Sequence, residues 1–244
     1  LGLWLLRRHL VRLGTAALPS RAQVLAAAPF KRLFQLNLDL FLRTIVLQAA
    51  FVSFMALASR QGPVILAANA ILMHFFMLGS YCLDGFAFAA EAMVGRAVGA
   101  RDPRALRDAA RAGFVNAGLL ALLVGALFWL VAPWIVGLLT AIEPVRDAAL
   151  DYRIVVALIP LIAVWAFLFD GIFIGATRTA ELRNAMVASL AVYGLAAAAL
   201  VPWLGNPGLW TAMLIFLAAR GVFLALVYRR AGFGAAFAGG AAPG

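Results

Sequence analysis

The 244-residue chain is 66% hydrophobic and only 12% charged, about half the charged fraction of an ordinary soluble domain. Its mean hydropathy is +1.00, and apolar blocks of about 20 residues recur, each long enough as a helix to cross a bilayer. These values exclude a soluble globular domain and predict an all-α polytopic membrane helix bundle. The net charge of +10 does not indicate nucleic-acid binding, because the arginines cluster between apolar blocks, as in loops beside an anionic membrane face.

Residues 1–35 begin with LGLWLLRR, which is interpreted as the end of a preceding helix, followed by a basic cytoplasmic connector. On this interpretation the chain is a piece of a longer protein. Six transmembrane helices are predicted within 36–230, at 36–58, 64–94, 112–137, 148–175, 185–204 and 209–228. The uncharged tail 231–244 is expected to be disordered.

Turn residues support these boundaries. Asp102 is suited to cap a helix whose first turn holds Pro103, and Pro144 suits the start of another helix. The stretch LGNPG at 204–208 predicts a tight turn between two apolar blocks.

The basic residues predict the orientation of the bundle. One side of the predicted topology has only Arg60, Arg146 and Arg153. The other side has Arg7, Arg8, Arg12, Arg21, Lys31, Arg32, Arg96, Arg101, Arg104, Arg107, Arg111, Arg178, Arg183, Arg229 and Arg230. By the positive-inside rule, the loops 95–111 and 176–184 and both chain ends face the cytoplasm.

Six charged residues fall within the predicted spans, and each needs a physical reason because a charge at the bilayer centre costs about 2.5–3.5 kcal/mol on insertion scales. They are Asp39, Arg43, Asp84, Glu91, Asp170 and Arg220. Structural pairing is one reason: Asp39 with Arg43 four residues on, Glu91 with Arg96, and Asp170 at the interface near Arg178. Ion coupling or gating is the other.

Helical spacing places His74, Tyr81, Asp84 and Glu91 on one face of the second span, with Ser80 one turn from Asp84. Such a polar stripe faces a bundle interior or a water-filled cavity. It forms either a hydrogen-bond network that fixes packing or a cation or proton site. The four acids and two bases leave two carboxylates without an intramembrane partner, which favours a proton or sodium relay.

Some other polar and small residues are expected to join helices. Asn69 and Asn116 are candidates for hydrogen bonds between helices, and Gly118 and Gly125 for close helix approach. The single cysteine and two histidines exclude a disulfide framework and a Cys/His metal cluster. No protease, hydrolase or phosphate-loop motif is present, so neither an enzyme nor a cofactor is expected.

Four blocks together resemble the multidrug and toxic compound extrusion (MATE) family, in particular its DinF-type bacterial branch. They are NLDLFLRTIVLQ (37–48), LDGFAFAAEAMVGRAVGARD (83–102), LFDGIFIGATRTAELRNAM (168–186) and PWLGNPGLW (202–210). The resemblance implies twelve spans in two six-helix lobes, of which this chain supplies the C-terminal one. The partner lobe would be the missing N-terminal part of the same polypeptide.

The resemblance implies a secondary antiporter of the bacterial inner membrane that exports organic, often cationic compounds in exchange for H⁺ or Na⁺ by alternating access. Asp84, Asp39, Asp170 and Glu91 are then the candidate coupling or gating groups, with Arg43 and Arg220 as charge partners. Candidate cavity residues, for which packing is the alternative role, are Asn37, Gln48, Phe54, Met55, Met73, Phe76 and Tyr81. Two other functions stay open: a lipid-linked sugar flippase, which a basic central cavity would favour, and a non-transporting membrane scaffold.

Overall fold

The computed structural model describes residues 27–230, and every regular element in that range is an α-helix. The helices are α3 (Ala27–Ser59), α4 (Pro63–Gly99), α5 (Pro103–Leu139), α6 (Glu143–Leu150), α7 (Arg153–Gly175), α8 (Thr179–Leu204) and α9 (Asn206–Arg230). Six of them, all but α6, are long and apolar enough to cross a membrane. The prediction of six spans is therefore confirmed. The predicted tail and most of the predicted connector lie outside the described residues.

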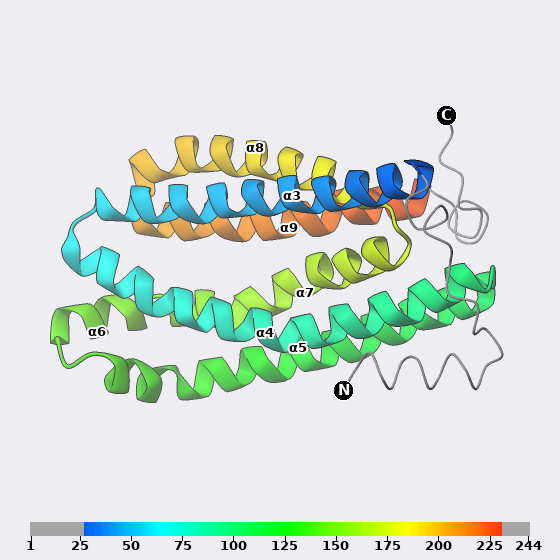
Figure 1. The fold of residues 1–244 in the computed structure, drawn as a ribbon. Helices are drawn as coiled ribbons and strands as arrows, with labels where there is room; N and C mark the ends of the chain where they lie inside the picture. The colour runs from blue at the N-terminus through cyan, green and yellow to red at the C-terminus, as the bar shows by residue number, and fades with distance from the viewer. Residues whose placement is uncertain (1–26, 231–244) are drawn as a thin grey trace, which may run out of the picture. The chain divides into compact units, whose positions relative to one another are not determined.

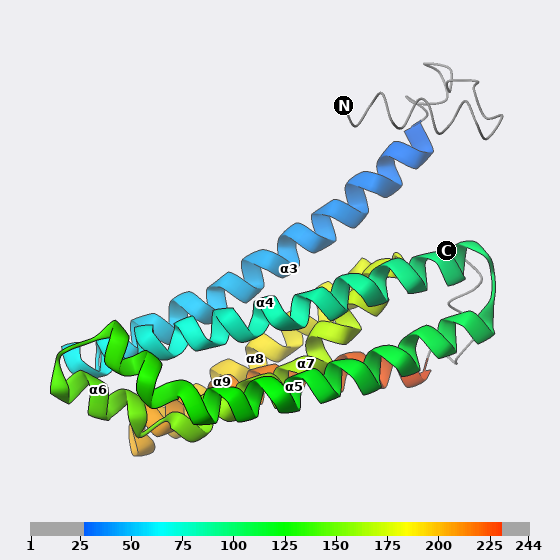
Figure 2. The ribbon, with the colours of Figure 1, turned by 90° about the horizontal axis from the view of Figure 1, so that it is seen from below.

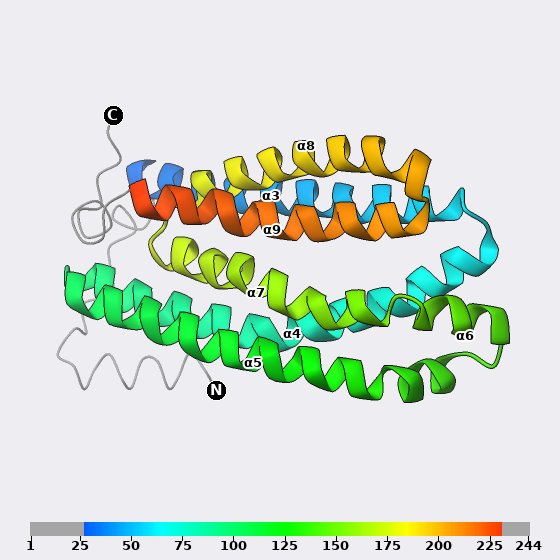
Figure 3. The same ribbon diagram turned by 180° about the vertical axis from the view of Figure 1, so that it is seen from behind.

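The chain divides into two compact units, Leu1–Leu38 and Asp39–Gly244. In the second unit α7 contacts α4, α5 and α9, while α8 packs along α9. Figures 1 and 3 show α7 between the α4–α5 pair and α9. Because consecutive spans alternate in direction, the α4–α5 turn, the α7–α8 turn and the end of α9 meet at one end of this unit. That end is rich in arginine, and Figure 2 shows α6 at the opposite end.

The helix caps follow the predicted turn chemistry. The Asp102 carboxylate accepts hydrogen bonds from the backbone N–H groups of Arg104 (2.9 Å) and Ala105 (3.1 Å), and Pro103 occupies the first turn of α5. Pro144 lies in the first turn of α6. Between α8 and α9 the chain turns at Gly205, whose φ of 61° is in the left-handed region that favours glycine.

Two predicted boundaries are wrong. Residues 95–111 are helical except for a turn at 100–102, because the arginines of α5 project outward while Leu106, Ala109 and Ala110 of the same turns are buried. An amphipathic extension therefore carries the helix beyond its membrane-spanning part. The predicted span 148–175 is interrupted, since the polar residues Asp151 and Tyr152 form a turn between α6 and α7.

Small residues set the closest helix contacts. A Cβ on Gly125 of α5 would lie 2.6 Å from the carbonyl oxygen of Ala157 on α7, so the predicted packing role of Gly125 is confirmed. A Cβ on Gly118 would meet no atom of residues 27–230 within 4 Å, so within this part of the chain the prediction is wrong for Gly118. Gly171 of α7 lies directly against the backbone of Ala87 on α4.

A buried amide pair joins α4 to the start of α9. Asn69 Nδ2 donates to Asn206 Oδ1 (2.7 Å), and Asn206 Nδ2 donates back to Asn69 Oδ1 (3.1 Å). Trp210 Nε1 also donates to Asn69 Oδ1 (2.8 Å). Asn69 therefore joins helices as predicted, whereas Asn116 donates to the Ala112 carbonyl of its own helix and, within residues 27–230, to no other helix.

Burial raises the pKa of Tyr152, in the α6–α7 turn, above its ordinary value, so this phenol stays neutral at physiological pH.

Candidate functional site

A cavity of about 750 Å³ lies between α3, α4, α7 and α9 of the second unit. One part of its wall is apolar and adaptable, with Phe51, Met55, Met73, Phe76 and Met77 contributed by α3 and α4. The remaining wall carries charge, and it is lined by Arg43, Asp84, Glu91, Asp170 and Arg220. A mainly apolar pocket with a few convergent polar groups is the usual form of a small-molecule site.

Asp170 lies at the centre of the charged wall. Its Oδ2 accepts a hydrogen bond from Arg220 Nη2 at 2.7 Å and another from Arg43 Nη2. The side chains of Arg220 and Asp170 are only 3% and 9% exposed, and that of Arg43 is 17% exposed. Three helices far apart in the sequence are thus joined by one carboxylate.

Arg220 has further support from aromatic rings. Its guanidinium carbon lies 5.7 Å from the ring centroid of Phe167 and 5.8 Å from that of Phe216, within the range of a cation–π attraction. Within residues 27–230, the Nε atoms of Arg43 and Arg220 have no hydrogen-bond acceptor although both are buried. The two arginines therefore keep donor capacity that Asp170 does not use.

Asp84 and Glu91 are half-buried on the cavity face of α4, two helical turns apart. Neither carboxylate forms an ion pair with any residue of the described chain, so the expected Glu91–Arg96 pair is not present. The cavity thus holds three carboxylates and two guanidinium groups. An excess of negative charge in an apolar wall favours a cationic occupant or a proton.

Asp39 lies apart from the cavity. Its carboxylate pairs with Arg183 of α8 and accepts a hydrogen bond from Thr179 Oγ1 at 3.1 Å. The ion pair between Asp39 and Arg43 considered above is not formed. Asp39 pairs instead with a residue of α8, and Arg43 pairs with Asp170 of α7. Arg178 pairs with Glu181, three residues on in the same helix, rather than holding Asp170 at the interface.

Two glycines position the charged faces of α4 and α7. Gly171 and Gly175, four residues apart on α7, lie against the backbone of Ala87 and Glu91, four apart on α4. A Cβ on Gly175 would lie 2.5 Å from the Glu91 carbonyl oxygen. This small-xxx-small contact lets the backbones approach closely and brings Asp170 to the same cavity as Asp84.

The structure divides the other predicted cavity residues into two groups. Gln48, Met55, Met73, Phe76 and Tyr81 line the cavity. Phe54 is fully buried against Trp210, with ring centroids 4.7 Å apart, and Asn37 donates to the carbonyl of Leu33 in the first unit.

Sequence reasoning missed several lining residues. Phe88 is one helical turn from Asp84, so the spacing that placed Asp84 and Glu91 on one face also predicts it. The sequence did not predict Phe167 and Ile174 of α7 as lining residues, because their position at the cavity depends on how α7 crosses α4. No group of three His, Cys, Asp or Glu side chains suited to a metal ion occurs in the described part of the chain.

Comparison with known proteins gives consistent matches. Residues 40–205 match the MatE family. DNA damage-inducible protein F of Escherichia coli is 43% identical over 201 residues, which are 82% of this chain and 44% of that protein. The probable multidrug resistance protein NorM of Pseudomonas syringae pv. tomato is 26% identical over 216 residues, 84% of this chain and 46% of that protein.

The fold is similar to that of solved MATE structures. A crystal structure of MATE in the straight conformation superposes with a TM-score of 0.78 at 19% identity, over 94% of this chain and 52% of that one. This chain therefore spans about half the length of the proteins it matches.

Proposed function

This chain belongs to the MatE family, whose members are membrane transporters rather than enzymes, and we propose that it forms one half of a secondary antiporter. In the full-length protein this half would export lipophilic organic cations in exchange for H⁺ or Na⁺ by alternating access. The observation that carries the proposal is the cavity of about 750 Å³, in which an aromatic and methionine wall faces an excess of carboxylates. The second half of the pathway would come from a partner lobe of the same polypeptide.

Asp84 is the best candidate for the coupling group. It is half-buried, it faces the cavity, and no basic residue of the described chain is paired with it. In this proposal Asp84 holds either a proton or a cation, so that the coupling ion and a cationic substrate compete for one negative charge. Glu91, two turns nearer the arginine-rich end, would act at the gate, and Asp170 would stay paired with its two arginines.

The test is gradient-driven efflux from proteoliposomes that contain the full-length gene product. With a pH or sodium gradient imposed, a fluorescent lipophilic cation is expected to leave the vesicles. We expect Asp84→Asn to abolish the dependence of efflux on the gradient, because the amide neither titrates nor binds a cation by charge.

The matched control is Asp108→Asn, which neutralises an exposed carboxylate of α5 outside the cavity and is expected to leave efflux unchanged. Absence of gradient-driven efflux from the unmodified protein would contradict the antiporter and favour a scaffold. An unchanged gradient dependence in Asp84→Asn would assign Asp84 to packing.

A lipid-linked sugar flippase is the second candidate, and one observation favours it. Arg43 and Arg220 line the cavity, so its arginines are not confined to the loops. Both guanidinium groups are bound to Asp170, however, and the acids of the cavity outnumber the bases. Movement of a lipid-linked sugar between leaflets, without cation efflux, would support the flippase.

A further inference from the structure

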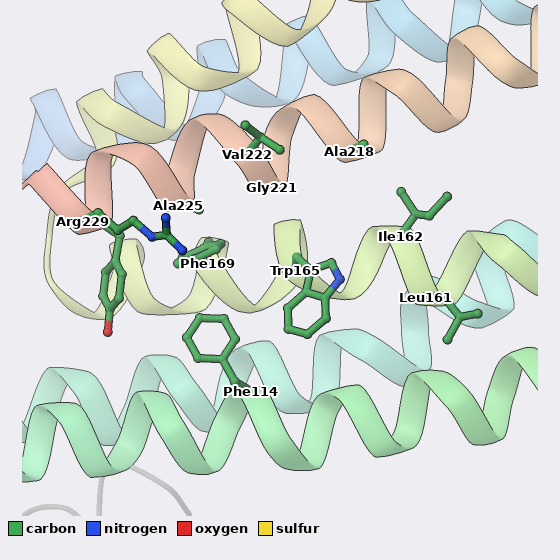
Figure 4. Close-up of a pocket in the computed structure, with 11 residues that line it drawn as sticks. Phe114, Leu161, Ile162, Trp165, Phe169, Ala218, Gly221, Val222, Ala225 and Arg229 are labelled. Atoms are coloured by element: carbon green, nitrogen blue, oxygen red, sulfur yellow. The ribbon is translucent and has the colours of Figure 1, made fainter.

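A second pocket of about 630 Å³ lies between α5, α7 and α9 (Figure 4). Its wall is apolar apart from Tyr228 and Arg229. The rings of Phe114 and Trp165 have centroids 6.0 Å apart, and those of Phe114 and Phe169 are 5.2 Å apart. Such mutually packed rings form a wall that exists before any ligand binds.

This pocket is separate from the cavity described above. On α7 it is lined by Trp165 and Phe169, whereas the charged cavity is lined by Phe167 and Asp170. At about 100° per residue, these two sets lie on opposite faces of the helix. The pocket opens on the outer surface of the spanning helices, where Trp165 is 45% exposed and Val222 of α9 is 55% exposed.

The length of the pocket corresponds to one leaflet of a membrane. On α9 its lining runs from Ala218 to Arg229, a rise of about 16 Å along the helix. The hydrocarbon core of a bilayer is about 30 Å thick, so this length is about half of it. Arg229 is at the end of α9, a helix long and apolar enough to cross a membrane, so in a bilayer the pocket would extend from the level of the lipid headgroups toward the bilayer centre.

Arg229 gives the headgroup end a positive charge. Figure 4 shows its side chain directed from α9 toward Phe169, at one end of the pocket, with Leu161 at the other end. Among residues 27–230, no carboxylate forms an ion pair with Arg229. A guanidinium group binds phosphate through two parallel hydrogen bonds, and its aliphatic stem packs on apolar surface.

We propose that this pocket binds one anionic phospholipid, with an acyl chain along the apolar wall and the phosphate at Arg229. The charge complementarity selects the occupant, because an unpaired arginine at headgroup depth above an apolar groove matches an anionic amphiphile. A zwitterionic lipid carries its own cation beside the phosphate and is less favoured at this arginine-rich end. The proposal is independent of what the other cavity transports.

The test is native mass spectrometry of the full-length, delipidated protein titrated with phosphatidylglycerol or with phosphatidylcholine. We expect one phosphatidylglycerol to bind more tightly than the rest and more tightly than phosphatidylcholine. Arg229→Gln is expected to weaken that first binding step about tenfold, as for loss of one charge-assisted contact. Ala225→Phe, which fills the groove from α9, is expected to abolish it.

Arg230→Gln is the matched control, because it removes the adjacent exposed arginine, which does not line the pocket. An equal loss of phosphatidylglycerol affinity in Arg229→Gln and Arg230→Gln would overturn the proposal, because it would show that the lipid responds to surface charge in general and not to this pocket. Unchanged binding in Ala225→Phe would exclude the groove as the acyl site. Val222→Trp fills the groove from an exposed position, and it decides the question if Ala225→Phe does not fold.

Discussion

Asp170 determines whether two arginines can be accommodated inside the second unit. The side chain of Arg220 is only 3% exposed, so water cannot replace the carboxylate oxygen that its guanidinium group now contacts. Arg43 shares the same oxygen. Helical periodicity predicted the shared face of Asp84 and Glu91, but it carried no information on this ion cluster, because its members come from three helices. The pairing of Asp170 with Arg43 and Arg220 depends on how α3, α7 and α9 pack against one another.

Removal of Asp170 is therefore expected to destabilise the protein strongly. Asp170→Ala leaves the buried guanidinium group of Arg220 and the partly buried one of Arg43 without their shared partner, and breaking a buried pair costs about 3–5 kcal/mol. The measurement is the free energy of unfolding of the full-length protein in detergent, followed by helical circular dichroism.

The matched control for this change is Glu181→Ala, which breaks the more exposed Arg178–Glu181 pair and should cost less than about 1 kcal/mol. Equal losses of stability in the two variants would show that the Asp170 cluster does not stabilise the fold.

At the scale of the helices, the α4–α7 contact is set by the absence of side chains. Gly171 and Gly175 allow the two backbones to touch. Asp170 lies beside this contact on α7, and Glu91 lies at it on α4. The sequence predicted the six spans and the caps at Asp102 and Pro144, since these depend on local composition. It did not separate the glycines that face a neighbouring helix, such as Gly125, from Gly118, which faces open space.

This difference between glycines can be tested by substitution. Gly171→Val places methyl groups where the Ala87 carbonyl now lies, so α4 and α7 must separate, and we expect a fall of several degrees in melting temperature together with loss of efflux. Gly118→Ala meets no atom and should be neutral or stabilising by up to about 1 kcal/mol, because alanine is the better helix former. A comparable fall in melting temperature and in efflux in both variants would indicate that the α4–α7 contact has no special role.

At the scale of the whole molecule, arginines gather at one end of the second unit. They lie in the α4–α5 turn, the first turn of α5, the α7–α8 turn and the end of α9, and they are Arg101, Arg104, Arg178, Arg229 and Arg230. The distribution of charge along the sequence anticipated this end, because the alternation of spans fixes which turns lie together. The orientation of that end toward the cytoplasm follows from the positive-inside rule and is a proposal about the membrane-inserted protein.

Cysteine accessibility tests this orientation. In a full-length protein from which every other cysteine has been removed, which in this chain means Cys82→Ser, Arg60→Cys and Ala100→Cys place single thiols at exposed positions in the α3–α4 and α4–α5 turns, at opposite ends of α4. We expect a membrane-impermeant maleimide to label Arg60→Cys in intact cells and to label Ala100→Cys only after permeabilisation. The reverse pattern would place the arginine-rich end outside. Arg229 and its proposed phospholipid would then lie in the outer leaflet, whereas the expected pattern places them in the cytoplasmic leaflet.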